Sequence, residues 1–423
     1  MKYWDIFRKK THKKYEDGTD MFQTGEKMDK MKKNMDHYSK NEFAVALLAL
    51  FGFNYADLNQ NVKKNIDTMD VEMIYKYVRP AHQNLVLSCY MENGNKAFAD
   101  SIKEEYRKYC ITSVAHHYMF IEQQYEIQKL LDKEGIRNAF IKGHCFDYSL
   151  FGDNAKKFKI ARDIDILVHP SDALKAYQLL KQFSCKTDCG LSNYLPFYQR
   201  FGHHYPEFDY KGINIDIHHR IVWPYMTQLG INYFIPEILE RGETIEINGK
   251  ELRTVDSIDV CILLMCFIYK DQIYAHDYNP HNISSLLQRL MMANDYSEMI
   301  DRIKRYNLIE VAKYCVQLCT YLYKELFGKE FKCELDECSD FPVATDDYIN
   351  QFRSHAIYCN DIIGYFDIPL ENRYFMSTQE LETYVYKESE NKYKMSPQEL
   401  FDQKVVKFVE HFGLKHPPTQ RLV

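Results

Sequence analysis

Three carboxylates lie on two short segments that have the pattern of β-strands. In ARDIDILV, Asp163 and Asp165 are two residues apart, so a strand turns both to one face while the isoleucines between and after them face the core. In GINIDIHH, Asp216 alternates with isoleucines in the same way, and His218 follows on its face. Neighbouring carboxylates repel each other and raise each other's pKa. We therefore expect these strands to hold a cation or to serve a binding function.

Carboxylate oxygens are the ligands that Mg²⁺ and Mn²⁺ prefer, so Asp163, Asp165 and Asp216 predict a site for one of these ions. Two such ions can activate an attacking hydroxyl and neutralise phosphate charge during in-line displacement. An acidic pair on a strand edge can also be simply solvated, and Asp-x-Asp occurs often by chance. The second acidic strand favours the metal site over that alternative.

A Lys-Gly pair follows a short apolar segment at residues 136–141 and precedes a helix-like segment. Gly143 lets backbone N–H groups approach a phosphate at the start of a helix. Lys142 can add a positive charge beside the β- or γ-phosphate. Strand–Lys–Gly–helix by itself is usually only a turn. The basic run at residues 156–159 is usually a solvated loop, but its position before the first acidic strand can bring one lysine to the phosphates.

Composition predicts a soluble globular protein with two or three structural units, since the chain has 423 residues, 46% apolar and 27% charged. The net charge of −6 argues against general DNA binding. The longest apolar run, residues 260–269, is too short to cross a membrane and predicts a buried helix. Because neither an export signal nor a CxxC pair is recognisable, we expect a cytoplasmic protein whose cysteines are reduced.

The elements that must position these residues divide the chain into four regions. Residues 1–41 form a polar, modestly basic arm, and residues 42–135 carry the three- to four-residue apolar spacing of helices. Residues 136–255 hold the predicted strands, including a hairpin with an Asn-Gly tip. Residues 256–423 are again mainly helical. We therefore expect a small α/β core between two helical regions.

Two local predictions concern the neighbours of the acidic strands. Residues 203–210 are expected to pair with residues 212–221 across a Lys-Gly turn. His203 and His204 can then approach the acids, although a structural or exposed position is favoured for one of them. Ser171 is the expected N-cap of the helix that follows the first acidic strand.

Together, GIRNAFIKG, ARDIDILV with the proline and helix after it, and NIDIHHR resemble the bacterial uncharacterised nucleotidyltransferase family of the polymerase-β-like superfamily. The resemblance is close over residues 134–220 and loose over residues 70–300. It implies an α+β nucleotidyltransferase fold, in which a small mixed sheet is flanked by N- and C-terminal helical regions. It also implies two-metal transfer of a nucleotidyl group from an NTP, ATP by default, to an acceptor.

In this resemblance Asp163 and Asp165 match the first two metal ligands and Asp216 the third, so these three are the expected catalytic residues. The expected nucleotide-binding residues are the turn, two basic positions before the first acid, and the histidine after the third: Lys142, Gly143, Lys159, Arg162 and His218. The superfamily usually has Gly-Ser at the turn. The family often has Arg where Lys159 stands, and a lysine lacks the planar fork of an arginine. The phosphate contacts therefore depart from the family pattern.

We therefore expect a metal-dependent nucleotidyltransferase that moves an NMP to a hydroxyl acceptor, which the sequence leaves open among small molecules, RNA and protein. In this scheme Asp163 and Asp165 hold both ions, while Asp216 holds the catalytic ion and helps to deprotonate the acceptor. The alternative is a non-catalytic nucleotide- or partner-binding protein on the same fold, favoured by the missing Gly-Ser pair and the large helical fraction. Convergence of all three aspartates distinguishes the two hypotheses.

Overall fold

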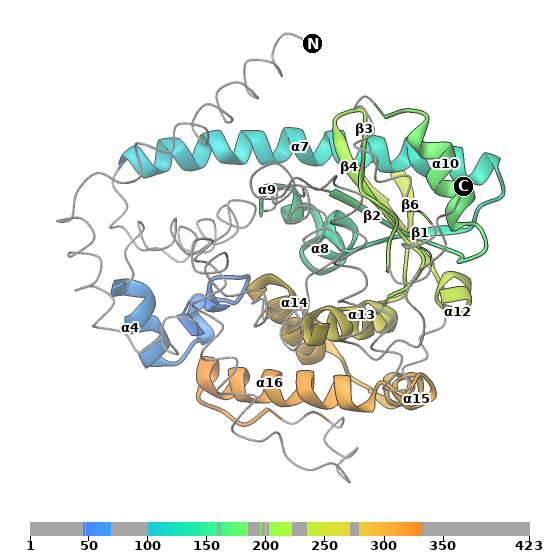
Figure 1. The fold of residues 1–423 in the computed structure, drawn as a ribbon. Helices are drawn as coiled ribbons and strands as arrows, with labels where there is room; N and C mark the ends of the chain where they lie inside the picture. Colours follow the sequence, from blue (N-terminus) through green and yellow to red (C-terminus); the bar gives the residue numbers. More distant parts are fainter. Residues whose placement is uncertain are drawn as a thin grey trace, which may run out of the picture.

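A mixed six-stranded sheet lies between two groups of helices in the computed structural model of the chain (Figure 1). The structure describes residues 45–46, 48–68, 100–158, 161, 163–184, 195, 199, 203–221, 235–270, 279–331 and 333. This arrangement confirms the predicted α+β fold class. Over these residues, every helix is too short or too polar to cross a membrane.

The sheet has the strand order β3-β4-β2-β1-β6-β5. Its strands are β1 Asn138–Ile141, β2 Asp163–Val168, β3 Phe208–Tyr210, β4 Ile213–His218, β5 Glu243–Ile247 and β6 Lys250–Thr254. β2 pairs parallel with β4, and β1 with β6, whereas the other neighbours are antiparallel. Both predicted hairpins are present, with turns at Lys211-Gly212 and Asn248-Gly249. Both residues of each turn have positive φ, as two-residue hairpin turns require.

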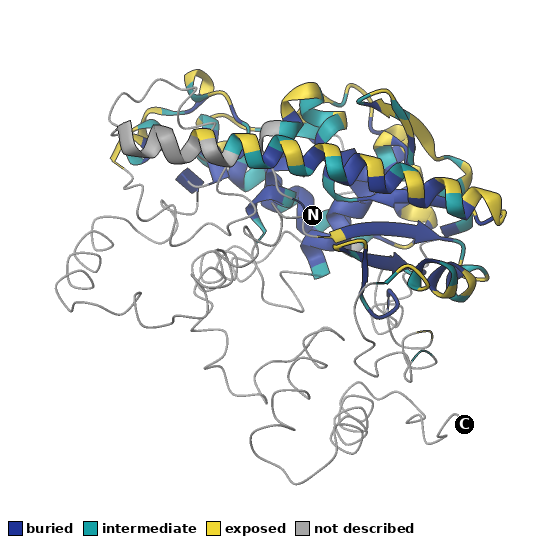
Figure 2. Cartoon of the chain, turned by 90° about the horizontal axis from the view of Figure 1, so that it is seen from above, coloured by how far each residue is buried: buried dark blue, intermediate teal, exposed yellow. Residues whose placement is uncertain are grey.

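One face of the sheet is apolar because side chains alternate along β2 and β4. The isoleucines of these strands form a buried cluster with α7 (Asp100–Lys133) and α10 (Ala173–Lys181). Figure 2 shows α7 lying along the sheet, with buried and exposed residues alternating over the part of the helix whose burial is described. The apolar stripe of this long helix therefore closes the face opposite the acids.

The acid-bearing face is covered by the C-terminal helices. α13 (Ser257–Tyr269) is buried over nearly its whole length, which confirms the prediction for the apolar run. It packs in a second cluster with α14 (Pro280–Met292) and α16 (Ile309–Phe327), joined by Ile141 and Leu167 of the sheet. The other described helices are η1 Tyr55–Asp57, α4 Gln60–Thr68, α8 Gly143–Phe151, η2 Gly152–Asn154, α9 Ala155–Phe158, α12 Ile235–Glu240 and α15 Ser297–Arg305.

Helix boundaries follow capping residues with one shift from the sequence-based prediction. Asp172, and not Ser171, occupies the N-cap position of α10, and its side chain makes no cap hydrogen bond. Asn279 caps α14 by accepting a hydrogen bond from the backbone N–H of Asn282, and Pro280 takes the first helical position. The chain enters α10 through a turn in which the Asp172 N–H donates to the carbonyl of His169 at 2.9 Å, so the helix begins without a side-chain cap.

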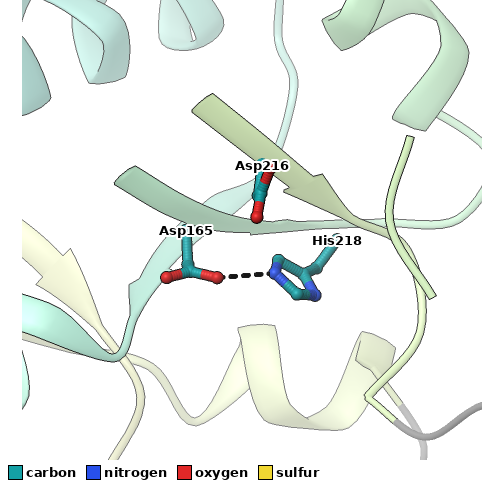
Figure 3. A group of neighbouring side chains, drawn as sticks. All are labelled: Asp165, Asp216 and His218. Atoms are coloured by element: carbon teal, nitrogen blue, oxygen red, sulfur yellow. Dashed lines mark hydrogen bonds and ion pairs between the residues drawn. The ribbon is translucent and has the colours of Figure 1, made fainter. Parts of the chain in front are cut away.

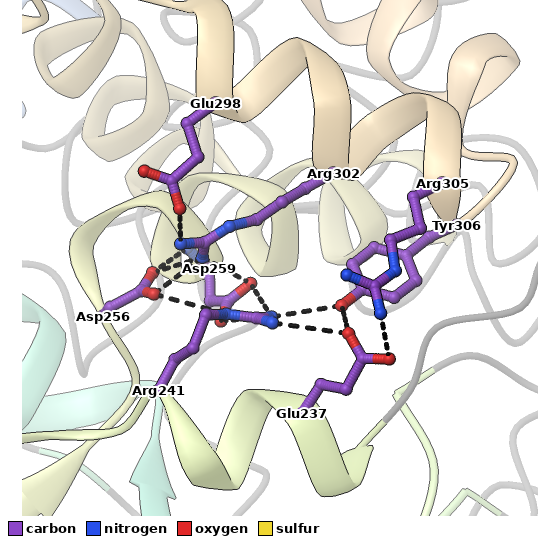
Figure 4. A network of polar contacts seen from close by, with 8 residues as sticks. All are labelled: Glu237, Arg241, Asp256, Asp259, Glu298, Arg302, Arg305 and Tyr306. Carbon is purple, nitrogen blue, oxygen red and sulfur yellow. Dashed lines mark hydrogen bonds and ion pairs between the residues drawn. The ribbon is translucent and has the colours of Figure 1, made fainter.

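A buried ionic network ties the start of α13 to neighbouring helices (Figure 4). Asp256 caps the helix by accepting a hydrogen bond from the N–H of Asp259 at 2.7 Å. The Asp256 carboxylate also accepts from Arg302 Nη1 at 2.6 and 2.8 Å. Arg241 Nη2 donates to the fully buried Asp259 at 2.9 Å, and Arg302 lies 3.1 Å from the same carboxylate. Two neighbouring acids are thus compensated by two guanidinium groups.

Asp259→Asn is expected to lower the free energy of unfolding by about 3–5 kcal/mol, because two arginines lose the carboxylate that they share in the protein interior. Urea denaturation followed by circular dichroism measures this loss. Glu298→Gln is the matched control, since Glu298 pairs with the same Arg302 from a side chain that is 62% exposed. There we expect a loss of about 1 kcal/mol or less. Equal losses in the two variants would contradict the role assigned to Asp259.

Candidate functional site

The parallel pairing of β2 and β4 places Asp165 directly opposite Asp216. Both side chains are buried, being 6% and 8% exposed. One carboxylate oxygen of each, together with a ring nitrogen of His218, lies within 4.8 Å of the others (Figure 3). In the described part of the chain, this is the one group of three ligand-type side chains close enough to hold a metal ion.

Asp163 lies on the same strand and stays outside this group. It is the first residue of β2, stands opposite Asn214, and is exposed. The alternation of β2 turns it to the same face as Asp165, as expected from the sequence. The group of three contains two of the predicted aspartates, with His218 as its third member, while the charge of Asp163 still acts on Asp216. The sequence predicted correctly the face of β2 on which Asp163 lies. How deeply Asp163 is buried depends on where the strand meets solvent.

Lys142 brings a positive charge to Asp165. β1 runs antiparallel to β2, and Ile141 lies opposite Asp165, so that the next residue can reach the acid. Lys142 Nζ donates to Asp165 Oδ1 at 2.6 Å and lies 4.8 Å from the ring centroid of Phe267 in α13. Burial alone would lower the pKa of Lys142, but the charge of Asp165 and the hydrogen bond to it raise the pKa above its usual value. The lysine therefore stays charged.

His218 donates a second hydrogen bond to the same oxygen of Asp165. Its Nε2 lies 2.8 Å from Oδ1, and because an ionised carboxylate only accepts, this nitrogen carries the proton. Burial would raise the pKa of Asp165, but Lys142 and His218 hold it well below its usual value. Burial, followed by the charge of Lys142, lowers the pKa of His218 to about 4. The pair is thus an ionised acid and a neutral imidazole at neutral pH.

Asp216 has no comparable compensation. Its Oδ1 is buried and has no hydrogen-bond partner among the described residues. Burial, and then the nearby charge of Asp165, raise the pKa of Asp216 well above its usual value. Such a buried, unpartnered group costs about 1–3 kcal/mol, which a cation shared with Asp165 would remove. The donor set therefore fits a divalent cation, and its carboxylates suit Mg²⁺ or Mn²⁺.

The predicted phosphate-binding turn lies between β1 and α8, and both of its residues have positive φ. Lys142 is the N-cap residue of α8 with φ 65°, and Gly143 follows with φ 55°. The Lys142 side chain makes no cap hydrogen bond. Among the described residues, nothing lies within 4 Å of where a Cβ on Gly143 would be. Helix N–H groups at such an open start attract anions. Lys159 and Arg162, the other predicted phosphate contacts, lie outside the described residues.

The two histidines that the sequence analysis expected to be able to approach the acids lie beside His218. His203 and His204 have ring centroids 5.3 and 5.4 Å from that of His218, and both are buried. A backbone bridge joins His204 to His218, one residue out of register with the β3–β4 ladder. The pattern HH before the hairpin and HH after it was the available signal. It could not show that both pairs are buried.

These histidines predict a stability that falls at acid pH. Burial lowers the pKa of His204 and of His219 to about 3 from 6.5. The unfolded state therefore binds more protons between these values. The contribution of each neutral ring to the free energy of unfolding is complete above pH 6.5. It is lost as the pH falls, by up to about 1.4 kcal/mol per pH unit.

His204→Gln is expected to reduce this slope, measured as the free energy of unfolding in urea at about pH 7.5 and about pH 5. Glutamine keeps a hydrogen-bond donor for the carbonyl of Tyr205, which His204 Nδ1 contacts at 2.7 Å. His169→Gln, at the turn after β2, is the control for the substitution itself. A slope unchanged by His204→Gln would contradict the prediction.

Comparison with known proteins finds one matching family model. A family model described as "Uncharacterised nucleotidyltransferase" matches residues 72–324, which include all six strands and the acidic pair. No curated protein matches the chain. One similar solved structure is that of an antigenic nucleotidyltransferase-like protein from Paracoccidioides brasiliensis. It is 16% identical, with a TM-score of 0.26, and the match covers 50% of this chain and 92% of that chain.

Proposed function

The chain belongs to the uncharacterised nucleotidyltransferase family, whose model matches more than half of it, and from that premise we propose that it transfers an NMP from an NTP to a hydroxyl acceptor. The observation that carries the proposal is the buried, in-register pair of Asp165 and Asp216, with an unpartnered oxygen on Asp216. ATP is the default donor. The acceptor may be sought among small molecules, RNA and protein.

Asp165 and Asp216 would hold a divalent cation, with His218 beside them as a nitrogen ligand or as the hydrogen-bond donor that orients Asp165. Asp163 stays a predicted further ligand, which would approach from the rim of the sheet. When bound, Mg²⁺ or Mn²⁺ supplies Lewis acidity that neutralises phosphate charge and favours ionisation of the acceptor hydroxyl.

The chain's own residues divide the remaining work. Lys142 is placed to pair with a phosphate, and Gly143 leaves room for the phosphate at the start of α8. Asp216 is a candidate to accept the proton of the attacking hydroxyl, because its buried Oδ1 has no hydrogen-bond partner among the described residues. Lys159 and Arg162 stay predictions for further phosphate contacts. A cytoplasmic location, where NTPs are available, also stays a prediction.

A non-catalytic nucleotide-binding protein is the second candidate. The position of Asp163 outside the group of three favours it, because the sequence-based scheme needed all three aspartates together. The two functions share the nucleotide site and differ in whether pyrophosphate is released.

The deciding experiment incubates the full chain with each of four α-labelled NTPs and Mg²⁺ or Mn²⁺, in the presence of small alcohols, RNA or protein. Release of pyrophosphate with transfer of label to an acceptor supports the transferase. NTP binding by calorimetry without pyrophosphate release supports the binding protein. Absence of NTP binding rejects both.

A further inference from the structure

Lys142 forms an ion pair with Asp165 in the structure. We propose that Lys142 competes with the divalent cation for Asp165 and gives it up when nucleotide phosphates bind, so that metal and nucleotide strengthen each other's binding. The inference rests on the proposed function, since it concerns how that same site is filled. It assigns Lys142 a role before any chemistry takes place.

The competition follows from the hydrogen bonds of one oxygen. Asp165 Oδ1 accepts from Lys142 Nζ at 2.6 Å and from His218 Nε2 at 2.8 Å. A carboxylate oxygen has about two lone pairs, so both are in use. A divalent ion between Asp165, Asp216 and His218 must share this carboxylate with the ammonium group. Two positive charges on one carboxylate repel each other, so each weakens the binding of the other to Asp165.

The surroundings of Lys142 keep it on Asp165 until another anion arrives. Its ammonium lies over the Phe267 ring at 4.8 Å, and Lys270 Nζ lies 5.9 Å from the centroid of the same ring. The ring attracts each cation, but the two lysines repel each other. Asp165 is the carboxylate that binds Lys142 directly. Leaving it without a new anionic partner is therefore unfavourable.

A nucleotide supplies that partner at the right place. Lys142 is the residue before the first turn of α8, where helix N–H groups also attract a phosphate. A phosphate bound there draws the ammonium from Asp165 and leaves two adjacent acids, Asp165 and Asp216, without a cation. The affinity for a divalent ion then rises. Because coupling between two ligands is reciprocal, the divalent ion must raise the affinity for the nucleotide by the same factor.

Removal of the competitor tests the proposal through metal binding alone. In Lys142→Met we expect the Kd of Mn²⁺, measured by calorimetry without nucleotide, to fall by about tenfold, within the usual range of coupling between sites. Lys142→Arg keeps the charge and should bind Mn²⁺ as the wild type does. Lys211→Met is the matched control, because Lys211 also has positive φ and pairs with an acid, Glu126, but lies on the surface. Unchanged or weaker binding of Mn²⁺ by Lys142→Met would overturn the proposal.

The wild-type protein provides a second measurement, which does not depend on a variant's stability. Acetylation of lysines, quantified by peptide mass spectrometry, is expected to increase at Lys142 on addition of Mn²⁺ and to stay constant at Lys211. Constant labelling of Lys142 while Mn²⁺ binds would overturn the proposal.

The outcomes separate this inference from the proposed function. Failure of both the wild type and Lys142→Met to bind Mn²⁺ overturns the inference and the metal site together. Nucleotidyl transfer with no gain in Mn²⁺ affinity in Lys142→Met overturns the inference alone. The expected gain without any nucleotidyl transfer upholds the inference and rejects the transferase.

Discussion

Asp165→Asn is expected to abolish tight binding of the divalent cation and to lower kcat/KM for the NTP by about a thousandfold or more, equivalent to about 4 kcal/mol of transition-state stabilisation. Asp165 is the acid on which Lys142 and His218 converge, and it faces Asp216. An amide keeps the shape of this side chain but cannot neutralise a cation. The labelled-NTP assay gives the rate, calorimetry with Mn²⁺ gives the affinity, and circular dichroism verifies the fold.

Asp163→Asn is the matched control, because it makes the same chemical change two residues earlier on the same face. We expect a much smaller loss, about tenfold at most, since Asp163 is exposed and lies outside the group of three. Equal losses would support the sequence-based prediction that Asp163 is itself a metal ligand. A full rate in Asp165→Asn would contradict the site.

Asp216→Asn should separate activity from stability. We expect transfer to fall by about a hundredfold or more, while the metal-free protein becomes more stable by about 1–3 kcal/mol, because asparagine removes a buried negative charge beside Asp165. The gain has a defined pH dependence. Burial, and then the charge of Asp165, raise the pKa of Asp216 in the folded state. The protonated side chain therefore contributes its full stability below pH 3.8, the usual pKa of an aspartate, and this contribution is lost as the pH rises through the raised pKa.

The difference in the free energy of unfolding between Asp216→Asn and the wild type should therefore widen with pH. Urea denaturation with a chelator at about pH 5 and about pH 8.5 measures it. Added Mn²⁺ should stabilise the wild type and leave the variant unchanged, because only the wild type binds it tightly. A variant less stable than the wild type at both pH values would show that Asp216 is compensated by a partner not identified here.

Two acidic pairs in this fold show why Asp216→Asn is expected to lose activity and gain stability. Asp256 and Asp259 lie close together in the protein, but two arginines bind them directly. Asp165 and Asp216 are both buried. Only Asp165 is contacted by a lysine, Lys142. Two guanidinium groups face the two acids of the first pair. One ammonium group contacts the second pair and reaches only Asp165, so the pair has an excess of negative charge, which is the electrostatic condition of a site that binds a cation.

Local patterns in the sequence were sufficient for the elements and their faces. Alternation in DIDILV and INIDIH predicted which side chains enter the core, because a strand has a two-residue period. The Lys211-Gly212 and Asn248-Gly249 pairs predicted the two hairpins, since few residues tolerate positive φ. The two acidic motifs, together with GIRNAFIKG, also carried the family resemblance. The four-region division of the chain stays a prediction, because residues 1–44 and 334–423 lie outside the described part.

The tertiary structure decided which of these residues meet. The register between β2 and β4, which no short pattern specifies, sets Asp165 against Asp216 and leaves Asp163 at the rim. The antiparallel return of β1 brings Lys142 to Asp165. Phe267 comes from a helix more than a hundred residues away along the chain. A sequence specifies side-chain type and direction through local geometry, whereas distance and burial depend on the packing of segments that are remote in the chain.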